Sequence, residues 1–108
     1  MKRLLLSVLL SLASLPAFAQ FMTGAQLKDY LDEAQAHSSF MKETFAMGYV
    51  SGVFDSLAGR EVCPQHEVSA KDSMGIVHRY LRAHPEQLSQ NAAPLAAQAL
   101  RDAYPCNR

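Results

Sequence analysis

The sequence predicts an all-α fold, a small four-helix bundle with one short turn, stapled by a single disulfide bond. Three observations lead to this prediction. No stretch after the N-terminal segment alternates apolar and polar residues as a half-buried strand does. Four segments instead place apolar residues three and four positions apart, and capping or breaking residues bound them. The chain also has only two cysteines, which allow one intrachain bridge.

The first two predicted helices span residues 23–36 and 40–58. Thr23 and Gln26 stand three positions apart at the start of the first helix, which is the spacing of a capping box. Its expected apolar stripe consists of Ala25, Leu27, Tyr30, Leu31 and Ala34. The second helix is the most apolar segment after the N-terminal run, with Ser39 as its predicted N-cap and Gly59 as its stop.

The third and fourth predicted helices follow a loop over residues 59–68. Ser69 and Asp72 form a near capping box for the third helix, which runs to about Ala83 before Pro85 ends it. Residues 85–90 form a short connection with about one helical turn. Asn91 is the predicted cap of the fourth helix, over residues 92–103, whose inward face consists of Leu95, Ala96, Ala99 and Leu100.

Residues 1–19 have the pattern of a secretory signal peptide. Two basic residues precede an apolar run over residues 4–15, and Pro16 breaks that run. The small residues Ala17 and Ala19 stand at −3 and −1, so we expect cleavage between Ala19 and Gln20. The run is too short for a membrane anchor, which needs about 20 apolar residues. We therefore expect a periplasmic, single-domain protein over residues 20–108.

Composition and charge narrow the class of function. The 108 residues include ten basic and ten acidic ones, and the signal carries two of the basic residues, so the mature chain has a net charge of −2. Such a chain has no overall positive electrostatic field that would attract nucleic acid or the membrane surface. A domain of this size has a marginal core and is too short for a two-lobed enzyme.

In the oxidising compartment, Cys63 and Cys106 are expected to form a disulfide bond. Closing this long loop contributes about 4 kcal/mol in the chain-entropy model. A free thiol and an intermolecular bridge are the alternatives.

The chain contains no pattern typical of catalysis, of a metal site or of a cofactor site. The four histidines show no ligand spacing, and we expect them to be exposed residues near helix ends: His37, His66, His78 and His84. No phosphate-binding glycine loop occurs, and bridged cysteines are neither nucleophiles nor ligands. We predict that the protein is not an enzyme and takes no metal or cofactor.

Gly48, Gly52 and Ser56 stand four residues apart and form a stripe of small residues along one face of the second helix. Glycine inside a helix costs about 1 kcal/mol relative to alanine, so the stripe indicates close approach of another helix. Two interpretations remain open: packing of a helix from the same subunit, and a subunit interface.

Four motifs occur in order at compact spacing: Gly48-Tyr49-Val50-x-Gly52-Val53-x-Asp55, Val62-Cys63-Pro64, Val77-x-x-Tyr80-Leu81-x-x-His84-Pro85-Glu86 and Ala99-Leu100-x-x-Ala103-Tyr104-Pro105-Cys106. Together they resemble the Rap/Tai immunity-protein family over essentially the whole mature chain. The resemblance implies a small periplasmic helical protein that binds and blocks a peptidoglycan amidase effector of a type VI secretion system. With the glycine stripe, it also implies a homodimer.

The resemblance bears on the cysteines in two ways. Cys63 and Cys106 resemble one cysteine pair of the family, which supports the predicted bridge. Family members often carry a second pair, and here Leu31 and Ala46 occupy those positions. Both partners are absent together, and we expect the two apolar residues to pack where that bridge would lie.

The loop after the second helix is our candidate for partner binding, with Arg60, Glu61, Gln65, His66 and Glu67 as its residues. A bridged loop loses less entropy when it enters a cleft. The alternative is a solvated loop that only hosts the disulfide. The runner-up function is a small periplasmic stress protein or acid chaperone, in which histidines and carboxylates respond to acid.

Overall fold

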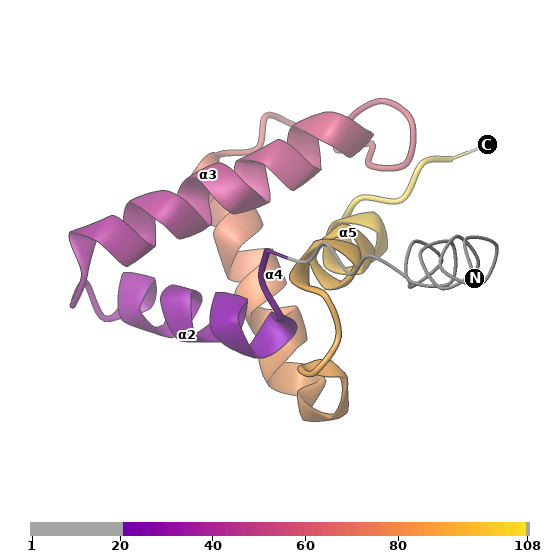
Figure 1. The fold of residues 1–108 in the computed structure, drawn as a ribbon. Helices are drawn as coiled ribbons and strands as arrows, with labels where there is room; N and C mark the ends of the chain where they lie inside the picture. The colour runs from indigo at the N-terminus through magenta and orange to yellow at the C-terminus, as the bar shows by residue number, and fades with distance from the viewer. Residues whose placement is uncertain (1–20, 108) are drawn as a thin grey trace, which may run out of the picture.

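The computed structural model describes residues 21–107 and confirms the all-α fold over that range (Figure 1). Four α-helices and a 3₁₀ turn follow one another, and no strand is formed within these residues. The elements are α2 (Gly24–Gln35), α3 (Phe40–Leu57), α4 (Ala70–Ala83), η1 (Pro85–Gln87) and α5 (Ala92–Ala103). The predicted signal peptide and the Ala19–Gln20 junction lie outside the described residues. Within that range, no helix has the length and apolarity needed to cross a membrane.

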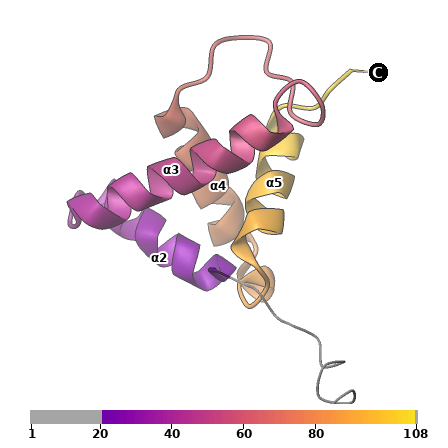
Figure 2. The ribbon, with the colours of Figure 1, turned by 45° about the horizontal axis from the view of Figure 1, so that its top comes forward.

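The helices α2 and α3 form an antiparallel pair that diverges from a tight turn, while α4 and α5 lie across its open side (Figures 1 and 2). His37 in the turn has a φ of 52°, in the left-handed region. Lys42 of α3 ties the pair together because its Nζ contacts Asp29 Oδ2 at 2.9 Å and also the Glu33 carboxylate. The same ammonium lies 5.2 Å from the centre of the Tyr30 ring, within cation–π range.

A single hydrophobic core lies where the four helices meet, and every helix contributes to it. Its largest fully buried side chains are Leu27, Leu81, Leu100, Val50, Val62 and Val77. Leu31 and Ala46 are both buried in this cluster, on α2 and α3 respectively. These two apolar residues therefore pack in the core, as predicted.

Capping hydrogen bonds fix where the helices begin. At three of the four helix starts, the side chain predicted from the sequence makes the capping bond. Thr23 with Gln26 and Ser69 with Asp72 form reciprocal capping boxes, and the Ser39 side chain accepts from the backbone N–H of Lys42. The prediction for Asn91 was wrong in its mechanism, since its side chain makes no capping hydrogen bond. Backbone bonds hold this junction instead: the N–H of Ala92 donates to Met22 O at 3.0 Å.

The most apolar helix is not the most buried one. Only Ala46 and Val50 of α3 are buried, whereas four large apolar side chains on it are exposed: Phe40, Met41, Phe45 and Met47. The predicted stripe of α2 was also wrong at Ala25, which is exposed. Its buried positions are Gly24, Leu27, Leu31 and Ala34.

The predicted disulfide between Cys63 and Cys106 is present, with their Cα atoms 4.9 Å apart. It joins the loop after α3 to the tail after α5. The backbone N–H of Cys63 also donates to Tyr104 O at 2.9 Å, and Val62 next to it is fully buried. Gly59 ends α3 at a φ of 79°, the conformation that favours glycine. The loop is therefore anchored at both its start and its middle.

Candidate functional site

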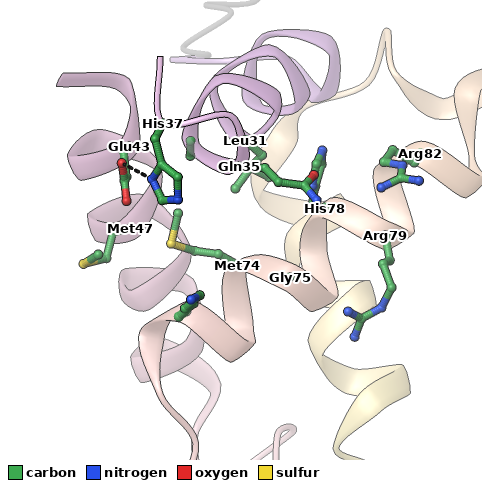
Figure 3. A pocket seen from close by; sticks show the side chains of 12 residues that line it. Leu31, Gln35, His37, Glu43, Met47, Met74, Gly75, His78, Arg79 and Arg82 are labelled. Atoms are coloured by element: carbon green, nitrogen blue, oxygen red, sulfur yellow. Dashed lines mark ion pairs between the residues drawn. The ribbon is translucent and has the colours of Figure 1, made fainter. Parts of the chain in front are cut away.

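A groove of about 570 Å³ runs between the C-terminal end of α2, the N-terminal half of α3 and one face of α4 (Figure 3). We call it the α4 groove. Its lining residues are Leu31, Ala34, Gln35, His37, Glu43, Met47, Lys71, Met74, Gly75, His78, Arg79 and Arg82. Apolar side chains, among them two methionines, share this surface with five basic or imidazole groups. Such a mixture is typical of a site that binds another molecule.

Helical spacing places the cations of the groove on one side of α4. Arg79 and Arg82 stand eight and eleven positions after Lys71, which places them about 80° and about 20° around the helix axis from it. Within residues 21–107, none of the three lies within ion-pair distance of a carboxylate. All three are exposed. The groove therefore presents positive charge that the described part of the chain leaves uncompensated.

His78 joins the wall of the groove to α2. Its side chain is only 9% exposed, and its Nε2–H donates to Asp32 Oδ1 at 2.6 Å. Lys28 Nζ contacts the other oxygen, Asp32 Oδ2, at 2.8 Å. Partial burial by itself raises the pKa of Asp32, but the hydrogen bonds from Lys28 and His78 together outweigh it, so the pKa of this carboxyl lies below its usual value. The expectation of an exposed helix-end histidine was wrong for His78.

Glu43 is the one carboxylate among the groove's lining residues, and it lies 3.5 Å from His37 Nδ1 (Figure 3). His37 itself is exposed, as expected, and so is His66. His84 is half-buried against Tyr80, with the two ring centres 4.3 Å apart, and its Nδ1 lies 3.1 Å from Glu86. The Tyr80 hydroxyl donates to Gln87 at 2.9 Å, so the Tyr-Leu-x-x-His-Pro-Glu motif fixes the end of α4.

The predicted partner-binding loop lies on the other side of the first turn of α4. Gln65, His66 and Glu67 are exposed and border a second groove of about 420 Å³ against the C-terminal tail. Glu61 accepts from Arg101 of α5 at 3.3 Å, and Arg60 donates to the backbone carbonyl of Ser56. Two of the five predicted residues therefore hold the loop, while three project to solvent.

The stripe of small residues is on the exposed face of α3. A Cβ atom added to Gly48 or Gly52 would meet nothing within 4 Å, so none of the helices within residues 21–107 packs there. The interpretation as intrachain helix packing was therefore wrong. Met41 and Phe45 continue the same face towards the helix start and are also exposed. Ser56, at the far end of the stripe, is the stripe residue that contacts the loop, because its backbone carbonyl accepts a hydrogen bond from Arg60.

Sequence reasoning missed the α4 groove. One signal for it was present: within α4, no acidic residue stands three or four positions from Lys71, Arg79 or Arg82. Gly75, on the same face, was a second signal. The packing of α2 and α3 against α4 turns this basic helix face into a groove. No local sequence pattern predicts that packing.

The described residues contain no group of three His, Cys, Asp or Glu side chains placed to hold a metal ion. Their exposed features are an anchored loop, a basic groove and a flat apolar helix face. Together with the disulfide bond, such features are typical of a small binding protein.

The family comparison agrees with that class. The family model for Rap1a immunity proteins matches residues 23–106, which is nearly the whole of the described fold. The chain belongs to the Rap1a immunity protein family, as the motifs predicted. A search of curated proteins found no match to it.

Proposed function

We propose that this protein is a periplasmic immunity protein that binds a peptidoglycan amidase effector and blocks its active site, without turnover and without a cofactor. The observation that carries the proposal is the family match over residues 23–106, because it spans the complete helical domain with both cysteines. The motif resemblance supports the class of effector, and the predicted signal peptide supports the compartment. Occlusion is stoichiometric, so one folded domain neutralises one effector.

In this proposal, the exposed part of the loop enters the effector's cleft. Gln65, His66 and Glu67 project to solvent, while the disulfide at Cys63 and the Arg101–Glu61 contact fix the loop at its base. A loop held in this way has less conformational entropy to lose on binding. It is also long enough to offer a few anchor residues in one patch, as inhibitor interfaces require.

The first test of the function is whether a neighbouring gene encodes a peptidoglycan amidase. That amidase is then purified and mixed with the mature protein. Calorimetry is expected to show tight binding of one domain per amidase. Replacing Gln65, His66 and Glu67 together by alanine is expected to weaken binding by about tenfold or more. The matched control is Ser89→Ala with Gln90→Ala, two exposed polar residues in the turn before α5. An amidase that does not bind, or a neighbouring gene unrelated to cell-wall hydrolysis, contradicts the proposal.

We also propose that the protein is a homodimer whose two copies of α3 pack face to face. Two helical glycines that no contact within residues 21–107 requires lower the stability of α3 by about 1 kcal/mol each relative to alanine. A second α3 approaching closely along Gly48 and Gly52 explains this cost. It also covers Met41 and Phe45, which are otherwise exposed. The symmetry of such an interface allows one stripe to serve both copies.

The oligomeric state is tested by light scattering on the eluting protein. The unaltered protein is expected to elute as a dimer, and Gly52→Leu is expected to give a folded monomer because its side chain separates the two helices. Ala25→Leu adds the same side chain at an exposed position of α2 and is expected to leave the dimer intact. A wild-type monomer, or a dimer unaffected by Gly52→Leu, contradicts the proposed interface.

The exposed apolar residues of α3 also favour the runner-up function, a stress or acid chaperone that binds unfolded clients. The two functions differ in their response to pH and to clients. A chaperone is expected to dissociate and to suppress aggregation of several unrelated unfolded proteins near pH 3. An immunity protein is expected to bind one amidase at neutral pH and to leave such aggregation unchanged.

A further inference from the structure

We infer that the α4 groove is a second contact site on this protein and that it takes a short, acidic, partly apolar segment of the effector. This inference rests on the proposed function and goes beyond it, because it concerns a different face of the first turn of α4 from the one that borders the proposed inhibitory loop. Lys71 lines the α4 groove while its neighbour Asp72 lines the groove beside the loop. A partner seated on the loop is therefore adjacent to the entrance of the α4 groove.

Charge decides the class of ligand. Three cations line the groove without a carboxylate partner among residues 21–107. The acid that lines the groove, Glu43, and the acid that holds its wall through His78, Asp32, are already engaged. Glu43 lies beside His37, and Asp32 is shared between Lys28 and His78. The mature chain as a whole is slightly acidic, so this positive region is a local feature. Carboxylates of a partner are the groups that complement it.

Spacing indicates a segment in extended conformation. The rise along α4 between Lys71 and Arg79 is about 12 Å, and between Lys71 and Arg82 about 16 Å. In an extended segment, side chains two residues apart point the same way, and those four apart stand about 13 Å apart. Acidic residues at alternate positions over about five residues therefore reach Lys71 and the arginine pair, and two methionines, Met47 and Met74, lie in the same groove for apolar side chains.

Gly75 lies between Lys71 and Arg79 on the face of α4 that lines the groove. A Cβ atom there would meet only the Arg79 guanidinium, at 3.5 Å, so packing within the chain does not require glycine. Its missing side chain leaves the helix backbone open to close approach. Methionine and arginine are also the residue types enriched at the core of protein interfaces. We therefore assign the groove to a protein segment in preference to a lipid surface or a nucleic acid.

The first experiment uses a labelled peptide, Glu-Leu-Glu-Leu-Glu, as the probe. Fluorescence anisotropy is expected to show saturable binding that weakens as salt is raised, because exposed charges are screened. Arg79→Gln with Arg82→Gln is expected to weaken binding by about tenfold or more. Arg101→Gln, an exchange of the same kind on α5, is expected to change it by less than about twofold. Gly75→Leu is expected to block the groove without altering charge, with folding checked by circular dichroism.

Two outcomes of this experiment overturn the inference. One is equal binding of the peptide Gln-Leu-Gln-Leu-Gln, which would show that carboxylates are not recognised. The other is tighter binding to vesicles that contain phosphatidylglycerol than to the acidic peptide, which would assign the groove to a membrane surface.

The second experiment repeats the groove variants with the purified amidase from the neighbouring gene. Weaker binding by the arginine double variant and by Gly75→Leu, with the Ser89→Ala and Gln90→Ala control unchanged, supports the inference. If the amidase binds all variants equally, the inference fails and the proposed immunity function stands. If the amidase binds neither the wild type nor any variant, the proposed function fails, and the peptide experiment alone decides whether the groove takes acidic segments.

Discussion

Among individual side chains, the pairing of His78 with Asp32 connects stability with pH. A buried imidazole needs a hydrogen-bond partner, and Asp32 of the neighbouring helix α2 provides one. The distance from His78 Nε2 to Asp32 Oδ1 is 2.6 Å. The sequence distance between the two residues is 46, so no local spacing predicts their contact. The helix periodicity did place His78 within α4. It did not show that α2 covers it, since that depends on how the helices pack.

Replacing Asp32 by asparagine tests this contact. A pKa that is lowered in the folded state contributes stability that is fully present above the usual value of 3.8 and is lost as pH falls through the folded value. We expect Asp32→Asn to lower the free energy of unfolding by up to about 1 kcal/mol at pH 7, because the side chain is 44% exposed. Urea unfolding at pH 7 and pH 3 measures the difference in the free energy of unfolding between the variant and the wild type. This difference is expected to shrink at pH 3. Glu67→Gln, at an exposed loop position, is the control. A difference that grows in acid contradicts this explanation.

His37 stores backbone strain in the turn between α2 and α3. A φ of 52° is costly for a residue with a side chain, by about 1 kcal/mol or more. Its side-chain contact with Glu43 is exposed and 3.5 Å long, so it offsets little of that cost. We expect His37→Gly to raise the free energy of unfolding by about 0.5 kcal/mol, as measured by urea unfolding. A loss of more than about 1 kcal/mol would mean that the imidazole contributes packing in the groove that outweighs the strain.

At the scale of the helix, capping residues were predicted from sequence more reliably than inward faces. A capping box involves residues three positions apart, so the sequence contains all of its parts. The face that a helix buries depends on its neighbours. In α3 apolar residues surround the axis, and only the packing of the other helices shows that Ala46 and Val50 are inside while Phe40 and Met41 are exposed.

The caps allow a comparison among three helix starts. Thr23→Ala and Ser69→Ala each remove a side-chain acceptor for a backbone N–H, so each is expected to lower the free energy of unfolding by about 1 kcal/mol. Asn91→Ala is expected to cost less than about 0.5 kcal/mol, because the Asn91 side chain makes no capping bond. Thermal or urea unfolding of the three variants measures this order. An Asn91 effect equal to the other two would contradict the assignment of the caps.

At the scale of the whole molecule, one disulfide holds together a core that is small for an independent domain. Both cysteines and their pairing followed from composition, compartment and family resemblance, since two cysteines permit only one bridge. The α4 groove did not follow in the same way. Its residues come from three helices, and no sequence pattern fixes the positions of those helices relative to one another.

The contribution of the bridge is measured by replacing Cys63 and Cys106 together by serine. The bridge closes a sequence separation of 43 residues, and we expect its loss to lower the free energy of unfolding by about 2–4 kcal/mol. Reductant is expected to lower the stability of the wild type to a similar degree and to leave the double variant unchanged. A double variant as stable as the oxidised wild type would show that the helical core is sufficient by itself.

In the proposed function, this domain neutralises a peptidoglycan amidase by stoichiometric binding. The most direct measurement is hydrolysis of peptidoglycan by the amidase from the neighbouring gene, followed while the mature protein is titrated into the reaction. Amidase activity is expected to fall linearly and to be abolished when one immunity domain is present for each amidase molecule. Hydrolysis that continues undiminished in the presence of a large excess of the folded, disulfide-bonded protein would contradict it.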